Sequence, residues 1–124
     1  METVRFGRTG LEVSLISLGT WSHGGPNKAG ERSVGWSGYN RDQSKQGLLD
    51  AFDEGINHWD TADVYGGGRS EELIGEVLKQ VDRSELVLAS KVGWDPGPHE
   101  HFYHPEWMRS QLQGSLQRLG TDVL

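Results

Sequence analysis

The feature that most constrains the fold of this chain is a threefold alternation of a short apolar run with a helical pattern. Each run is typical of a buried strand, and the apolar residues that follow it recur at helical spacing. Strands that alternate with helices form parallel sheets with right-handed crossovers. The sequence therefore predicts an α/β fold, with strands and helices in turn at 15–21, 42–54, 56–62, 70–81, 85–93 and 105–119.

Short segments at both ends extend this pattern. The stretch VRFGRTGLEVS (4–14) has two extended pieces around Thr9-Gly10 and predicts a β-hairpin. The stretch TDVL (121–124) resembles the opening of a fourth strand. A chain of 124 residues can form one domain with a single core. Two architectures fit this order: a doubly wound open sheet, or part of a (β/α)8 barrel.

Capping signals and glycines set the expected boundaries of the helices. Asp42 is the expected N-cap of the first helix and Ser70 that of the second, because short polar side chains accept hydrogen bonds from free N–H groups. Gly55 and Gly120 are expected to end the first and third helices. Residues 22–41 are polar and rich in glycine, and they predict a long loop that is either functional or mobile.

Composition excludes several classes of function. A formal net charge of −6 argues against nucleic acid or an anionic membrane as the main partner. The absence of cysteine excludes disulfides and thiolate metal ligands and fits a reducing cytoplasm. The first residues lack the apolar core of a signal peptide, and no apolar run approaches the ~18 residues of a transmembrane helix. We therefore expect a soluble cytoplasmic protein.

Three chemically active side chains fall at the carboxyl ends of neighbouring strands. Asp60 lies in INHWDTA, Tyr65 follows in the next loop, and Lys91 lies in ASKVG. Ligands bind at this edge of the sheet in both architectures. A lysine among apolar residues needs an anion, for which Asp60 is the natural partner. Because an ammonium stabilises a nearby phenolate, the trio predicts a general-acid device. The simpler interpretation is a buried ion pair beside an unrelated Tyr.

Gly19, Thr20 and Trp21 end the first strand at the same edge of the sheet. A glycine lets a ligand approach the backbone, a threonine can bind a ribose or phosphate, and a tryptophan offers a flat apolar wall. The simpler interpretation is a strand-to-loop turn with a tryptophan in the core.

Two other motifs are less informative. GGGRSEELIG (66–75) does not fit the G-x-G-x-x-G dinucleotide pattern in either register, and we interpret it as a tight loop before a capped helix. A cluster of His99, His101 and His104 lacks an obvious fourth metal ligand, so a solvated loop explains it more simply than a metal site.

Taken together, these segments resemble the aldo-keto reductase family. The resemblance rests on LISLGTW, INHWDTADVYGGGRSEELIGEVL and LVLASKVG in that order, with SLQRLGTDVL at the end. It covers nearly the whole chain, and D-T-A-x-x-Y-G followed by S-E-E-x-x-G is a specific signal. The resemblance implies a (β/α)8 barrel with a hairpin at its bottom, and NADPH-dependent reduction of aldehydes or ketones.

The resemblance also implies a role for each residue of the trio. Tyr65 would donate a proton to the carbonyl oxygen, Lys91 would make that proton easier to donate, and Asp60 would hold Lys91 in place.

Further residues would bind the ligands. Gly19, Thr20 and Asp60 would border the nicotinamide ribose, with Trp21 beside them. Trp21 and Trp94 would line the pocket of a small carbonyl substrate. No metal is implied.

The chain departs from the family in length. A (β/α)8 barrel needs ~250 residues, and the family's catalytic His follows the fourth strand, which only begins here. We therefore expect residues 1–124 to be the N-terminal portion of such a domain: a hairpin, about three βα units and the start of a fourth strand. Alone it would be inactive and would self-associate through open sheet edges. Two alternatives remain: a non-catalytic binding module resembling potassium-channel β subunits, and a small open α/β domain that closes its own edges.

Overall fold

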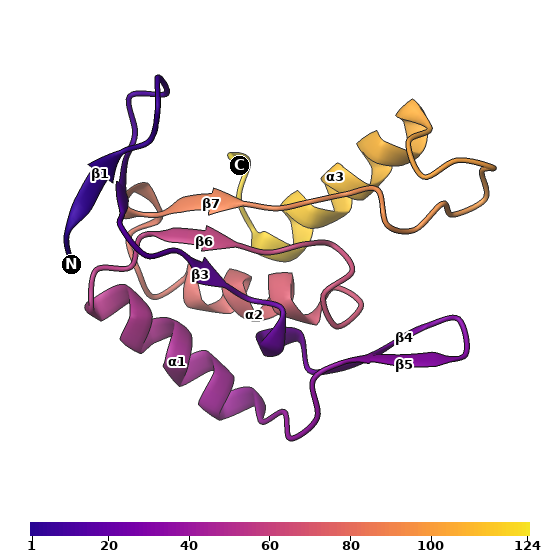
Figure 1. Cartoon of the computed structure of the whole chain (residues 1–124), viewed down its shortest axis with the longest axis horizontal. Coiled ribbons are helices and arrows are strands. Elements are labelled where there is room, and N and C mark those ends of the chain that lie inside the picture. Colours follow the sequence, from indigo (N-terminus) through magenta and orange to yellow (C-terminus); the bar gives the residue numbers. More distant parts are fainter.

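The computed structural model describes residues 1–124 as a mixed α/β chain (Figure 1). Seven strands and three α-helices are joined by loops and two short 3-10 turns. In chain order the strands and α-helices are β1 (Thr3–Arg5), β2 (Glu12–Ser14), β3 (Leu18–Gly19), β4 (Pro26–Ala29), β5 (Arg32–Gly35), α1 (Arg41–Asp53), β6 (His58–Asp60), α2 (Arg69–Val77), β7 (Val87–Ala89) and α3 (Pro105–Leu119).

A parallel sheet of three strands in the order β3-β6-β7 organises the molecule. The three strands run side by side in the same direction in Figure 1. Asp60 is paired with Gly19 on one side and with Ala89 on the other. The predicted α/β alternation is therefore confirmed. The strands β3 and β7 each have one neighbour, so the chain does not close the edges of this sheet.

The predicted N-terminal hairpin is also confirmed. Strands β1 and β2 pair antiparallel, and they lie at the end of the sheet where the parallel strands begin (Figure 1). The Asn57 side chain accepts a hydrogen bond of 2.7 Å from the Ser14 N–H, and the Asn57 N–H donates to the Ser14 hydroxyl. These bonds tie the hairpin to the residue before β6, far from the carboxyl ends of the strands.

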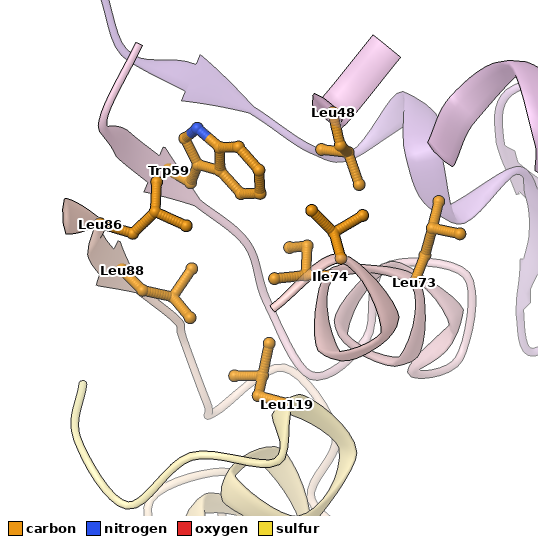
Figure 2. Packing of buried hydrophobic residues seen from close by; sticks show 8 residues of the cluster. Leu48, Trp59, Leu73, Ile74, Leu86, Leu88 and Leu119 are labelled. Carbon is orange, nitrogen blue, oxygen red and sulfur yellow. The ribbon is translucent and has the colours of Figure 1, made fainter. Parts of the chain in front are cut away.

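The hydrophobic core lies on one face of the sheet, between the strands and the helices (Figure 2). Trp59 of β6 and Leu88 of β7 point to this face. Because side chains alternate along a strand, the residues before and after each of them point to the opposite face of the sheet. The core consists of eight buried side chains: Leu48, Trp59, Leu73, Ile74, Val77, Leu86, Leu88 and Leu119. Helix α2 contributes three of them, as its amphipathic pattern predicted.

The parallel strands are shorter than predicted. Of residues 15–21 only Leu18 and Gly19 form a strand, and Leu15 and Ile16 are exposed rather than buried on both faces. The third strand covers Val87–Ala89 within the predicted 85–93. Residues 121–124 form no strand, so the expected start of a fourth strand is wrong for this structure.

The predicted caps of the first two helices were wrong. Helix α1 is capped by Asn40, whose side chain accepts from the Gln43 N–H, and not by Asp42. Helix α2 begins at Arg69 after Gly68, which has no side chain to cap it. Ser70 is the second residue of α2, and its hydroxyl donates to Thr20 at the end of β3 instead of capping the helix. The predicted stop of α3 at Gly120 is confirmed.

Residues 22–41 were predicted to form a long loop, but part of this segment has regular secondary structure. They contain a 3-10 turn (Ser22–Gly24) and an antiparallel hairpin of β4 and β5, in which Asn27 pairs with Val34. In Figure 1 the hairpin projects from the same end of the sheet as the carboxyl ends of β3, β6 and β7.

None of the three helices combines the length and the apolar character that a bilayer span requires.

Candidate active site

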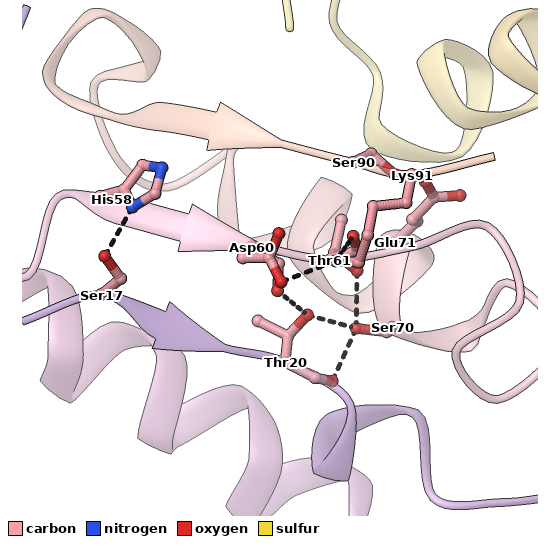
Figure 3. Close-up of polar contacts among 9 residues, drawn as sticks. All are labelled: Ser17, Thr20, His58, Asp60, Thr61, Ser70, Glu71, Ser90 and Lys91. Carbon is pink, nitrogen blue, oxygen red and sulfur yellow. Dashed lines mark hydrogen bonds and ion pairs between the residues drawn. The ribbon is translucent and has the colours of Figure 1, made fainter. Parts of the chain in front are cut away.

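Asp60 and Lys91 form an ion pair at the carboxyl ends of β6 and β7, as predicted (Figure 3). Lys91 Nζ donates to Asp60 Oδ2 at 2.6 Å and to the Thr61 carbonyl at 2.8 Å. The geometry follows from the register: Asp60 pairs with Ala89, and Lys91, two residues further, points to the same face. That face is opposite the core.

The pair is more exposed than the sequence suggested. The Lys91 and Asp60 side chains are 48% and 42% exposed, so Lys91 is not a buried lysine. Partial burial lowers the pKa of Lys91, but the interactions with Asp60 and Tyr65 outweigh it, and the pKa is raised. Lys91 therefore keeps its positive charge at neutral pH and remains open to a ligand.

Tyr65 lies beside this ammonium. Lys91 Nζ is 5.0 Å from the centroid of the Tyr65 ring. The Tyr65 backbone is fixed on both sides, because its N–H donates to the Ala62 carbonyl and its carbonyl accepts from the Ser70 N–H at the start of α2. The three residues that the sequence singled out are thus brought together at one edge of the sheet.

Two tryptophans extend the site beyond Tyr65. The Trp21 ring lies 6.3 Å from the Tyr65 ring between centroids, and the Trp36 ring lies 5.8 Å from Trp21 with an interplanar angle of 80°. Trp36, which follows β5, was missed by the sequence analysis, and a large aromatic residue within a polar Gly-rich loop was the available signal. Trp94 is 70% exposed and stacks on none of these rings.

Hydrogen bonds from α2 hold the ends of β3 and β6 (Figure 3). The Ser70 hydroxyl donates to the Thr20 carbonyl at 3.0 Å and lies 3.1 Å from the Thr61 hydroxyl. The buried Thr20 hydroxyl donates to the Asp60 carbonyl. Because it is already engaged, the Thr20 hydroxyl supports the strand ends in this structure rather than facing a ligand. A Cβ added at Gly19 would meet no atom within 4 Å, so the space over that residue is open.

A second network supports the strand end that carries Lys91. Glu71 of α2 is completely buried; its carboxylate accepts from Arg118 Nε at 2.7 Å and from the Ser90 hydroxyl at 2.6 Å. Ser90 points toward the helices because it alternates with Lys91 along the strand. Glu71 thus links α3, α2 and the residue before Lys91.

Asp63 is a buried carboxylate without a partner. Its residue is 6% exposed, and neither side-chain oxygen has a hydrogen-bond partner. Burial, followed by the nearby charge of Glu71, raises the pKa of Asp63 above its ordinary value. The Val64 backbone and the Arg118 charge act in the opposite direction but do not cancel this shift, so folding favours the protonated form of Asp63.

We expect Asp63→Asn to stabilise the chain at neutral pH. A carboxyl group whose pKa is raised on folding favours the folded state only while it is protonated, and this contribution is lost as the pH rises through the folded pKa. The gain in the urea midpoint should therefore be largest near neutral pH and shrink as the pH falls toward 3.8, the ordinary value. A variant less stable than the wild type at neutral pH would mean that ionised Asp63 has a stabilising partner.

The histidine cluster follows β7 in the loop before α3. The His99 and His104 rings stack in parallel with centroids 3.8 Å apart, and no group of three or more His, Cys, Asp or Glu residues is arranged to hold a metal ion. Stacking at the start of α3 accounts for two of the three histidines.

The residues at this edge fit the nicotinamide end of a dinucleotide. The approach to Gly19 is open, Asp60 is partly exposed, and Trp21 is 47% exposed beside Tyr65. These features leave room for a flat ring and a ribose over the strand ends.

Comparison with known proteins identifies the family. The family model "Aldo/keto reductase family" matches residues 15–124. The chain therefore belongs to the aldo-keto reductases, and the resemblance seen in its motifs is confirmed.

Individual relatives agree. The chain is 35% identical over its full length to the aldo-keto reductase YhdN of Bacillus subtilis, of which it covers 36%. It is 37% identical over 92% of its length to a putative voltage-gated potassium channel subunit beta of Schizosaccharomyces pombe, of which it covers 32%. It thus spans about a third of these relatives.

A solved structure shows the same arrangement. An aldo-keto reductase of Klebsiella pneumoniae in complex with NADPH is 33% identical, with a TM-score of 0.72 over 99% of this chain and 37% of that one. The partial barrel predicted from the sequence fits this match.

Proposed function

We propose that the full-length protein reduces aldehydes or ketones to alcohols, with Tyr65 as the proton donor. The observation that carries this proposal is the position of the Lys91 ammonium, which is bound to Asp60 at 2.6 Å and lies 5.0 Å from the centroid of the Tyr65 ring. Family membership and the NADPH complex of a relative support a nicotinamide cofactor.

Each residue has a part in the proposed reaction. Asp60 holds the Lys91 ammonium beside Tyr65, and Tyr65 Oη gives its proton to the carbonyl oxygen. A bound NADPH would supply a hydride to the carbonyl carbon, and with the proton from Tyr65 the carbonyl would become an alcohol. The phenolate left on Tyr65 is stabilised by Lys91 until it takes a proton from water.

The ligands are proposed to bind around this centre. The nicotinamide ribose is bordered by Gly19, Thr20 and Asp60. The Thr20 hydroxyl is already hydrogen-bonded within the protein, so Thr20 contributes by holding the backbone in place. Trp21 lies beside the cofactor and forms one wall of the substrate pocket. Trp94 is proposed as a second wall, because it is 70% exposed and accessible to a substrate.

The proposal is tested by assaying the full-length gene product with NADPH and with NADH against a panel of aldehydes and ketones. We expect NADPH-dependent reduction of at least one of them. For residues 1–124 alone we expect negligible turnover and weak NADPH binding. Saturable binding by a monomer of this chain at micromolar NADPH would contradict that second expectation. A cytoplasmic location stays a prediction.

The similarity to potassium-channel β subunits favours one alternative: a non-catalytic module that binds a partner protein or itself. The unpaired edges of β3 and β7 offer backbone groups for such an assembly. A stable oligomer of the full-length protein that turns over no carbonyl compound with either cofactor would favour this alternative.

A further inference from the structure

We propose that Trp36, presented by the β4–β5 hairpin, selects substrates with a flat aromatic group attached to the carbonyl. The proposal rests on the proposed function, since it extends the site at Tyr65. Three aromatic rings form a series of neighbours that begins beside the Lys91 ammonium: Tyr65, then Trp21 with its centroid 6.3 Å from that of Tyr65, then Trp36 with its centroid 5.8 Å from that of Trp21. A carbonyl group at Tyr65 would place its substituent along the two tryptophans.

The hairpin is fastened to the loop that carries Tyr65. The Asn27 side chain donates to the Val64 carbonyl at 2.8 Å. Arg69, at the start of α2, donates from Nε to the Gly24 carbonyl at 3.0 Å and from Nη2 to the Pro26 carbonyl. These bonds join residues far apart in the sequence, so the hairpin keeps a defined position relative to Tyr65.

Close backbone contact strengthens this attachment. A Cβ added at Gly24 would lie 2.7 Å from the Gly66 nitrogen and 2.7 Å from the Tyr65 carbonyl carbon. No side chain fits between the two segments, and glycine alone permits this approach. The Trp36 N–H donates to the Gly25 carbonyl at 3.2 Å, which fixes the residue at the base of the hairpin rather than at its tip.

Both tryptophans keep free surface for a ligand. Trp21 is 47% exposed and Trp36 is 51% exposed. Their near-perpendicular rings, at 80°, make an angled apolar surface. Such a surface suits a flat ring, which can stack on one indole and meet the edge of the other. Trp36 also borders an open surface hollow of about 270 Å³, whose lining is mostly polar and includes Ser22, His23 and Tyr39.

The test compares 2-naphthaldehyde with propanal as substrates of the full-length protein. For Trp36→Ala we expect kcat/KM for 2-naphthaldehyde to fall about tenfold, mainly through KM, with little change for propanal, because only the larger substrate reaches the indole. Trp36→Phe should restore most of the loss. The matched control is Val34→Ala on the same hairpin, where the side chain is 38% exposed and both substrates should be unaffected.

An equal loss for both substrates, or no loss for 2-naphthaldehyde, would overturn the proposal. Binding separates it from the proposed function: in an NMR titration of the wild type with 2-naphthaldehyde, we expect the indole N–H signal of Trp36 to shift. Binding that depends on Trp36 without any turnover would uphold this site and refute the reductase. Binding that Trp36→Ala leaves unchanged, or no binding at all, would refute this site whether or not other carbonyl compounds are reduced.

Discussion

Replacing Tyr65 by Phe in the full-length protein should lower kcat/KM for carbonyl reduction by about 10²–10⁴-fold, the range that a positioned general acid contributes. The substitution removes one hydroxyl group and leaves the ring that lies 5.0 Å from Lys91 Nζ and 6.3 Å from Trp21. The local packing should therefore persist, and NADPH affinity should not change. Steady-state kinetics with a carbonyl substrate measure kcat/KM, and a fluorescence titration measures the affinity for NADPH.

The matched control for this experiment is Tyr103→Phe. Tyr103 is 69% exposed in the loop before α3, its ring lies 6.3 Å from the Phe102 ring between centroids, and it has no aromatic pairing with Tyr65. The Tyr103→Phe variant should have the same kcat/KM for carbonyl reduction as the wild type. Unchanged turnover in Tyr65→Phe would refute Tyr65 as the proton donor.

Replacing Glu71 by Ala should lower the free energy of unfolding by about 3 kcal/mol. This is the low end of the ~3–5 kcal/mol that is lost when one partner of a buried ion pair is removed. Glu71 is completely buried, and its removal leaves the Arg118 guanidinium, 28% exposed, and the Ser90 hydroxyl without their acceptor. The low end applies because water can still reach Arg118. Urea denaturation of the chain measures the loss.

Helix α2 supplies its own control. Glu76 lies five residues further along the helix and pairs with Arg41 and Lys45 at the surface, with 39% of its side chain exposed. Exposed ion pairs contribute ~0–1 kcal/mol, so Glu76→Ala should change the free energy of unfolding little. Equal losses for the two variants would show that the Glu71 network is no stronger than a surface pair.

The parts of the site that depend on strand order could be predicted from the sequence. Side chains at the ends of neighbouring parallel strands meet at one edge of the sheet, and this places Asp60 against Lys91. The exposure of Lys91 could not be predicted, because it depends on which face of β7 receives the helices. Alternation puts Ser90 toward α2 and Lys91 on the opposite face.

The missed features depend on long-range contacts. Serine is a preferred N-cap residue, but the Ser70 hydroxyl donates to Thr20 at the end of β3, 50 residues earlier. This tertiary hydrogen bond replaces the cap. Residues 22–41 lack the alternation that reveals a strand. Their hairpin is held by Asn27 and by Arg69 of α2, and neither contact leaves a local pattern in the sequence.

The central claim is that Lys91 acts through Tyr65 in proton donation, and a double-mutant cycle tests it most directly. The cycle measures kcat for carbonyl reduction at saturating NADPH in the full-length protein with Lys91→Met, Tyr65→Phe and both together. If Lys91 acts through Tyr65, the double variant should be about as slow as Tyr65→Phe alone, because residues that act as a unit are strongly non-additive. Losses that multiply in the double variant would mean that the two residues act independently and would contradict the account.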